Sequence, residues 1–270
     1  MPLEMKLNNY SSFLLGFFSL FLIYWIGIQS SGITDLPINL LFSFATAVLA
    51  FIGGVMGLLV SKHWGGKKSA VGKAILLISL GIISWSFGNF IWSFYNFVLH
   101  QPVPYPSLSD IGYTLAIPLW AIGVFYLSMA TGVKFRLRES GSNILLTILP
   151  IIATIFSYYF LFVIARGSSF EVEGGLLKIF LDFYYPIGDW VILTMSFLLF
   201  GLSLKYLGGK FRLPIFIILA GFVVMFMADF SFSYATTIGT YYNGNISDLL
   251  FATAIFVLSF GISSLDIEET

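Results

Sequence analysis

The chain alternates between long apolar runs and short polar breaks. Eight runs are long enough for a helix to cross about 30 Å of hydrocarbon, which takes roughly 20 residues. They cover residues 10–29, 38–60, 73–98, 110–130, 143–165, 176–203, 213–237 and 247–265. The breaks between them, such as SKHWGGKK and YYNGNIS, carry glycines and polar residues that are typical of turns. The pattern predicts an all-α integral membrane protein with eight transmembrane helices in a single polytopic domain, 1–270.

The composition agrees with a membrane setting. Of the 270 residues, 58% are hydrophobic and 10% are charged, and the formal net charge is zero. The mean hydropathy of +0.95 exceeds that of water-soluble domains. Because the chain has no cysteine, disulfide bonds and thiolate metal sites are excluded, and both histidines, His63 and His100, fall in polar breaks. We expect the lipid bilayer as a partner, no nucleic acid and no metal, and the cofactor stays unassigned.

Lysine and arginine are distributed unevenly over the two ends of the predicted helices. If the N-terminus is cytoplasmic, eleven of the 13 Lys and Arg residues lie on that side, and only Arg166 and Lys178 lie outside. Short loops rich in Lys and Arg stay on the cytoplasmic side of a membrane. The bias predicts a multi-pass protein of the cell (plasma) membrane, with both termini cytoplasmic and the loop at residues 99–109 facing out.

Two pairs of stretches resemble each other. LGIISWSFGNFIWSFY aligns with AGFVVMFMADFSFSYA at a shift of 140 residues, which pairs Asn89 with Asp229. SDIGYTLAIPLWAIGV then aligns with SDLLFATAIFVLSFGI at a shift of 138 residues. An even number of helices per repeat leaves both halves in the same orientation, with any symmetry axis near the membrane normal. The alignment predicts a parallel 4+4 internal repeat, with residues 1–135 and 136–270 as its halves.

Two predicted helices begin at the outer side with the same polar spacing. Ser107 and Asp110 have the spacing of a capping box, in which one side chain caps the helix and the other reaches back. Asn245 and Asp248 repeat this spacing. Both carboxylates also lie at the positive end of a helix dipole. We interpret the four residues as helix caps, and a ligand-binding role for Asp110 and Asp248 stays open as the alternative.

Other polar side chains fall inside the apolar runs, where capping does not explain them. Asn89 and Asp229 lie in the outer half of the bilayer, and Asp182 and Asp189 lie seven residues apart on one face of a helix. An ionisable side chain in the membrane costs about 2.5–3.5 kcal/mol on insertion scales, so such positions are functional candidates. The candidate ligand-binding residues are Asn89, Trp92, Tyr113, Asp182, Tyr185, Asp189 and Asp229.

The same residues have a second interpretation. Hydrogen bonds between neighbouring helices would hold these groups without any ligand, at about 0.6 kcal/mol for an average bond in a membrane. Both interpretations stay open from the sequence. No catalytic residue is assigned, because no lysine lies in the middle of an apolar run and no GxSxG, HExxH or P-loop pattern occurs. We therefore expect a protein that is not an enzyme.

Three motifs resemble a known membrane module. PYPSLSDIGYTLAIPL, FYYPIGDWVIL and MADFSFSYATTIGTYYNGNISDLLFATAIF are similar to the N-terminal multi-helix membrane region of bacterial signalling proteins with GGDEF, EAL or histidine-kinase domains. The matching residues are Pro106, Ser107, Asp110, Tyr113, Tyr185, Pro186, Asp189, Ala228, Asp229 and Asp248. The resemblance spans most of the chain and implies a sensory or ligand-binding module standing alone, because we expect no catalytic domain within the 270 residues.

These observations favour one function and leave a second open. The first is a sensory module with an outward-facing acidic and aromatic pocket for a small molecule or a cation. Because no output domain is expected in the chain, such a module would signal through a separate cytoplasmic protein. The second is a small ion-coupled transporter or carrier, which a parallel repeat and the apolar runs interrupted by Pro118 and Pro186 also suit.

Overall fold

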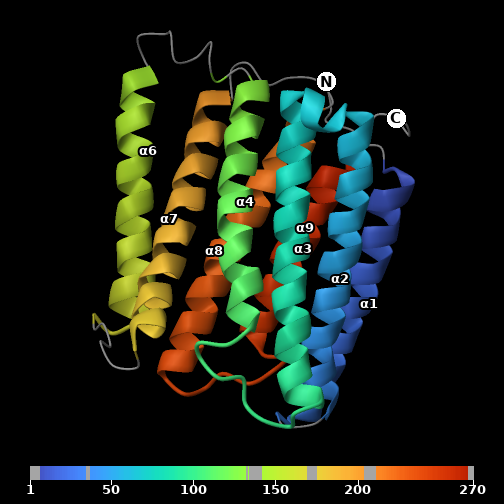
Figure 1. The fold of residues 1–270 in the computed structure, drawn as a ribbon, viewed down its shortest axis with the longest axis vertical. Coiled ribbons are helices and arrows are strands. Elements are labelled where there is room, and N and C mark those ends of the chain that lie inside the picture. Colours follow the sequence, from blue (N-terminus) through green and yellow to red (C-terminus); the bar gives the residue numbers. More distant parts are fainter. Residues whose placement is uncertain are drawn as a thin grey trace.

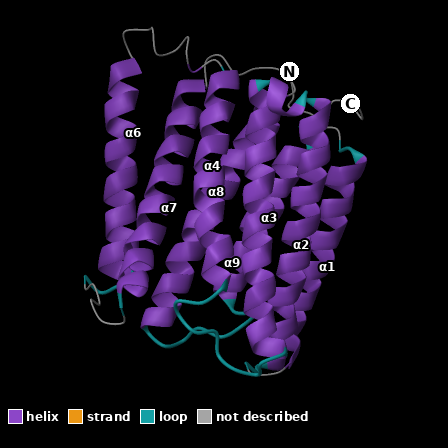
Figure 2. Ribbon diagram, in the orientation of Figure 1, coloured by secondary structure: helices purple, strands orange, loops and turns teal. Residues whose placement is uncertain are grey.

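The protein is a bundle of long helices (Figure 1). The computed structural model describes residues 7–34, 37–131, 133, 142–168, 175–203 and 211–266, and these residues contain helices and loops but no strand (Figure 2). Eight of the helical segments in this part of the chain are long and apolar enough to cross a membrane. This number and the all-helical class confirm the prediction made from the apolar runs.

The helix bounds follow the predicted runs within a few residues. They are α1 (Asn9–Ser31), α2 (Pro37–His63), α3 (Ala70–Phe97), α4 (Ser109–Ala130), α6 (Ser142–Ser157), α7 (Leu176–Ser203), α8 (Arg212–Thr237) and α9 (Ile246–Ser263). A short 3-10 helix, η1 (Gly66–Lys68), joins α2 to α3. A π-helix, η2 (Tyr158–Ile164), continues α6 to membrane length. The apolar pattern did not predict this change from α-helix to π-helix. The change leaves the length and the apolar character of the run unaltered.

Helix α3 is the most deeply buried of the long helices, and α6 lies at one edge of the bundle (Figure 1). In the apolar window of α3, 61% of the residues are buried, against 17% in the segment that α6 forms with η2. The main core combines side chains of several helices, among them Ile78, Ile82, Trp120, Phe222 and Leu258. Exposed side chains of α1 and α6 include many leucines and isoleucines, as expected for a surface that faces lipid.

Glycines allow α2 to pack closely against both α3 and α9. A Cβ on Gly54 would lie 2.5 Å from Cγ1 of Ile83 in α3, and one on Gly53 would lie 2.1 Å from Oγ of Ser259 in α9. Real side chains do not fit at such distances, so only glycine permits this approach. Small residues at these positions are typical of tightly packed membrane helices.

The start of α1 and the ends of α2 and α9 lie at the same end of the bundle. Asn8 Nδ2 donates a hydrogen bond to the carbonyl of Ser263 at 2.6 Å, and Trp64 Nε1 donates to the carbonyl of Leu265 at 2.7 Å. His63 Nδ1 lies 2.7 Å from Oδ1 of the fully buried Asp266. We call this the basic end, because it also carries the lysines that flank η1.

Candidate functional site

Asn89 joins three helices toward the end of the bundle opposite the basic end. The distribution of lysine and arginine predicts that this end faces out, and we call it the outer end. Its Nδ2 donates to the carbonyl of Ser43 in α2 at 2.9 Å, and its Oδ1 accepts from the hydroxyl of Tyr113 in α4 at 3.2 Å. The Asn89 residue is 8% exposed. Because both ends of the amide have a partner, Asn89 and Tyr113 meet the requirement for satisfying buried polar groups.

Trp92 lies one turn further along α3 and contacts a different partner. Its Nε1 donates to Oδ1 of Asn243 at 3.0 Å, and the same oxygen accepts from Ser43 Oγ at 3.2 Å. Asn243 belongs to the loop between α8 and α9. This loop therefore covers the outer ends of α2 and α3 and bonds to both. The role of Asn243 was not predicted, although its NGN turn sequence marks it as a loop residue.

The first capping pair lies at the start of α4. Asp110 Oδ2 accepts from the backbone N–H of Ser107 at 2.7 Å, which is the return bond of a capping box. Ser107 Oγ accepts from the N–H of Ser109 at 3.2 Å instead of from that of Asp110. Helix α4 begins at Ser109, preceded by Leu108, one residue later than a cap at Ser107 predicts.

The second capping pair lies at the start of α9. Asn245 is the N-cap, and its Oδ1 accepts from the N–H groups of Ser247 at 2.9 Å and Asp248 at 3.2 Å. Asp248 Oδ2 accepts from the N–H of Gly244 at 2.6 Å, one residue before the cap. Asp110 thus makes the return bond that the capping-box spacing predicts, whereas Asp248 reaches one residue further back.

Each of these carboxylates also accepts a hydrogen bond from a tyrosine. Tyr185 of α7 donates to Asp110 Oδ1 at 2.7 Å, and Tyr241 of the α8–α9 loop donates to Asp248 Oδ1 at 3.0 Å. Burial, and then the charge of Asp248, raise the pKa of Tyr241 well above its usual value, so that its phenol keeps the proton it donates. The two acidic residues therefore cap helices and also tie them to other segments.

Tyrosines hold the outer end of α7 to α4 and to the loop before it. Tyr105 donates to Asp182 at 3.0 Å, Tyr184 donates to the carbonyl of Thr114 at 2.9 Å, and Tyr185 bonds to Asp110. Burial, and then the nearby Asp182, raise the pKa of Tyr105. Asp182 also pairs with Arg166 at 3.8 Å and with Lys178 at 3.7 Å. It therefore lies among cations and donors at the outer end of α7.

Asp189 of α7 and Asp229 of α8 face each other inside the bundle. Their carboxyl groups lie within hydrogen-bonding reach of one another, and both residues are half-buried. An ionised carboxylate only accepts hydrogen bonds, so a bond between two carboxyl groups needs a shared proton. Two bare carboxylates at such a distance would repel each other. The contact can hold α7 to α8 only while a proton or another cation lies between the two groups.

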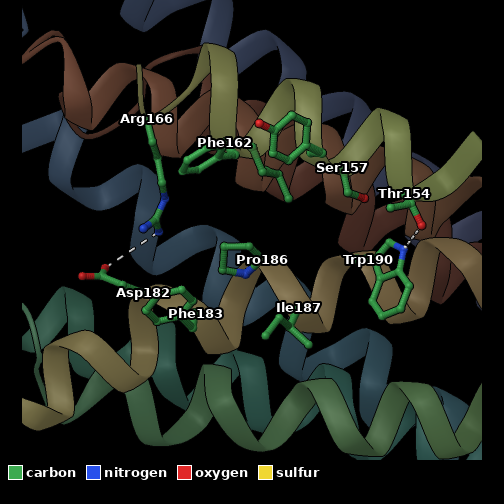
Figure 3. A pocket seen from close by; sticks show the side chains of 11 residues that line it. Thr154, Ser157, Phe162, Arg166, Asp182, Phe183, Pro186, Ile187 and Trp190 are labelled. Atoms are coloured by element: carbon green, nitrogen blue, oxygen red, sulfur yellow. Dashed lines mark hydrogen bonds and ion pairs between the residues drawn. The ribbon is translucent and has the colours of Figure 1, made fainter. Parts of the chain in front are cut away.

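A cavity of about 320 Å³ lies between α7 and the segment of α6 and η2 (Figure 3). Arg166 and Asp182 lie at one end, and Thr154 and Trp190 lie at the other, joined by a 2.9 Å hydrogen bond from the indole. Pro186 lies between the two ends. Among the candidate ligand-binding residues, Asp182 alone lines this cavity.

The candidate residues belong to several groups of contacts, and Asp182 is the one that lines the described cavity beside α7. A single outward-facing pocket shared by all of them stays a prediction. Asn89, Trp92 and Tyr113 bond around the outer ends of α2, α3 and α4, whereas Asp182 and Asp189 belong to α7. Helix α4, which carries Tyr113, packs against both α3 and α7, and so contacts the helices of both groups. Arg166 was assigned to the outer side but not recognised as the partner of Asp182. Their opposite charges are the signal that would have indicated the pair.

Comparisons with protein-family models, with curated proteins and with solved structures found no match to this chain. The resemblance to sensory membrane regions therefore stays a prediction. Within the described residues, no group of three or more His, Asp and Glu side chains could hold a metal ion.

Proposed function

We propose that this protein is a multi-pass plasma-membrane sensory module that binds a proton or a small cation in its outer half and signals through a separate cytoplasmic partner. The contact between Asp189 and Asp229 carries this proposal. A carboxyl pair between two helices is a two-state element, because a bound proton or cation decides whether the two groups attract or repel each other. With the proton or cation bound, the pair draws α7 and α8 together, and without it the two carboxylates push the helices apart.

The packing around the pair supports a movable α7. The glycines of α7 that meet neighbouring side chains point away from α8: a Cβ on Gly188 would lie 2.7 Å from Ile117 of α4, and one on Gly201 would lie 2.7 Å from Leu149 of α6. Helix α7 therefore approaches α4 and α6 closely at these glycines, but neither glycine faces α8. The carboxyl pair is a specific polar link across that interface.

Other titratable groups surround the pair. Tyr113 of α4 donates a hydrogen bond to Asn89, and Tyr185 of α7 donates one to Asp110. In the proposal, Asp110 and Asp248 retain their backbone and tyrosine donors in both states. The change in occupancy is therefore assigned to Asp189 and Asp229, whose described partners are each other.

The 4+4 repeat is part of the proposal, and contacts between glycines and their neighbours support it. A Cβ on Gly123 would lie 2.6 Å from Cγ1 of Ile78, and one on Gly261 would lie 2.8 Å from Cγ1 of Ile218. These pairs are related by the same shifts of 138 and 140 residues that align the two halves. In the proposal, the α3–α4 and α8–α9 hairpins pack through equivalent positions, and Asn89 and Asp229 occupy equivalent sites.

The basic end supplies a route to a cytoplasmic partner. Helix α8 packs closely on α9 through Gly221 and Gly261, and the end of α9 is joined to α2 by the bond between His63 and Asp266. A shift of α8 would therefore reach the segment that carries Lys67 and Lys68. Reporter fusions test the orientation: we expect a reporter after Thr270 to be cytoplasmic and one near Gln101 to be external.

The decisive experiment measures the separation of α7 and α8 as a function of pH. The chain has no cysteine, so spin labels can be attached to Phe180→Cys in α7 and Tyr234→Cys in α8, both at exposed positions. In lipid nanodiscs, we expect the distance to be longer at pH 9 than at pH 5. In Asp189→Asn the distance should stay short at both values, because an amide can donate to Asp229 without a titrating proton.

Asp182→Asn is the matched control on the same helix, and it should retain the pH-dependent change. An unchanged distance in the otherwise unmodified protein would overturn the proposal. Proton uptake into vesicles that contain the protein, lost in Asp189→Asn, would favour the carrier over the sensory module.

A further inference from the structure

The cavity between α7 and the α6–η2 segment is elongated. On α7 its lining extends from Asp182 to Trp190, a length of about 12 Å at the usual helical rise. On the facing wall it extends from Thr154 to Arg166. A space of about 320 Å³ with this length fits a linear molecule better than a compact one.

The middle of the cavity is apolar and opens sideways. Leu161, Phe162 and Ile187 line it, and the exposed fractions are 55% for Ile187 and 60% for Tyr158 at its margin. In a membrane this opening faces lipid, so a ligand would enter from the bilayer. Both walls depart from regular α-helix, because η2 is a π-helix and α7 contains Pro186. Such π segments often occur at functional sites.

One end of the cavity carries charge. Arg166 forms an ion pair with Asp182 at 3.8 Å, and Figure 3 shows the guanidinium reaching toward that carboxylate at the cavity end. A guanidinium has five N–H donors and binds carboxylates with defined geometry. The distribution of lysine and arginine assigns this end to the outer side of the membrane.

We propose that this cavity binds a free fatty acid from the outer leaflet, with its acyl chain between α6–η2 and α7 and its carboxylate at Arg166. The length and apolar lining match the chain, and the cation at the outer end matches the head group. The site is separate from the Asp189–Asp229 pair and goes beyond the proposed proton response, since neither aspartate lines the cavity.

Trp190 provides a reporter for this site, because it lines the end of the cavity away from Arg166. With the protein in phospholipid nanodiscs, a brominated fatty acid should quench tryptophan fluorescence in a saturable manner. Trp190→Phe should lose the saturable component. Arg166→Gln should weaken binding about tenfold, the loss expected for a charge-assisted hydrogen bond. The methyl ester of the same fatty acid should bind roughly tenfold more weakly for the same reason.

Ser157 offers a matched pair of variants. It lines the cavity, is 7% exposed, and its hydroxyl has no hydrogen-bond partner among the described residues. Ser157→Phe fills the space and should abolish saturable quenching, whereas Ser157→Ala keeps the space and should retain it. Ile187→Trp fills the cavity from the opposite wall and keeps the test decisive if Ser157→Phe does not fold.

If quenching rises linearly with fatty-acid concentration, and equally in all these proteins, the fatty acid only dissolves in the bilayer. That result would overturn the proposal. Equal affinity for the methyl ester would overturn the role of the carboxylate. Asp189→Asn should leave fatty-acid binding unchanged, and Ser157→Phe should leave the pH-dependent α7–α8 distance unchanged. Failure of either proposal is therefore distinguishable from failure of the other.

Discussion

Helices α2 and α3 meet through small residues, whereas α7 and α8, their counterparts in the proposed repeat, meet through two aspartates. A Cβ on Gly57 would lie 2.1 Å from Oγ of Ser79, so the first interface is held by close and permanent packing. Asp189 and Asp229 face each other across the second, and their contact depends on a bound proton or cation. In the proposed function, one half of the bundle is a rigid support and the other is the responsive part.

The largest effect is expected from a side chain placed in the rigid interface. Gly57→Val would force valine against the fully buried Ser79, and we expect a loss of about 3 kcal/mol of stability from overpacking. Thermal unfolding in detergent, followed by tryptophan fluorescence, measures it. Gly16→Val is the matched control, because no atom lies within 4 Å of its added Cβ. Equal melting of the two variants would show that α2 and α3 are not closely packed.

The next effect concerns the pH dependence of the responsive interface. The bond between Asp189 and Asp229 exists while a proton is shared, so its stabilisation is present at low pH and is lost as the pH rises. We expect a decrease of about 2 kcal/mol between pH 5 and pH 9, the usual contribution of a hydrogen bond to a charged group. Asp229→Asn should remove this dependence. If both proteins lose stability in parallel with rising pH, the pair is not its source.

A smaller effect is expected from the tyrosines that bind the two capping carboxylates. Tyr241→Phe removes the bond to Asp248, and Tyr185→Phe removes the bond to Asp110 together with a 3.5 Å contact to Thr114. Each variant should cost about 1.5 kcal/mol in unfolding free energy. Because Tyr185 helps to hold α7, its loss should also lengthen the spin-label distance between α7 and α8 at low pH. Tyr241→Phe should leave the α7–α8 distance unchanged. A change of that distance in Tyr241→Phe would contradict the assignment of the movement to α7.

The smallest effects compare the two helix caps. Asn245→Ala should cost about 1 kcal/mol, because its side chain accepts bonds from two backbone N–H groups. Ser107→Ala should cost only about 0.5 kcal/mol, because its hydroxyl accepts one N–H bond, at 3.2 Å. Chemical denaturation of the two variants in the same detergent would measure the difference. A larger loss for Ser107→Ala would reverse the assignment of the stronger cap.

Much of the fold could be predicted because helix length and apolar character are local properties. The run at 176–203 coincides with α7 (Leu176–Ser203), and the capping residues lie at the starts of α4 and α9. The candidate site was less accessible to such reasoning. Asn89 and Asp189 both fall in apolar runs, yet α4 packs against both of their helices and lies between them, and no periodicity along the chain reports which helices become neighbours.

The sequence by itself determined the number and bounds of the long helices, the positions of their polar side chains and the alignment between the halves. These follow from hydropathy, spacing and capping chemistry within one segment. Tertiary structure alone decided the partners: Tyr185 for Asp110, Arg166 for Asp182 and Asp229 for Asp189. Each partner comes from a different helix or loop, and its distance depends on how side-chain volumes let helices approach. The tertiary fold therefore decides whether a buried carboxyl group caps a helix, forms an ion pair or shares a proton.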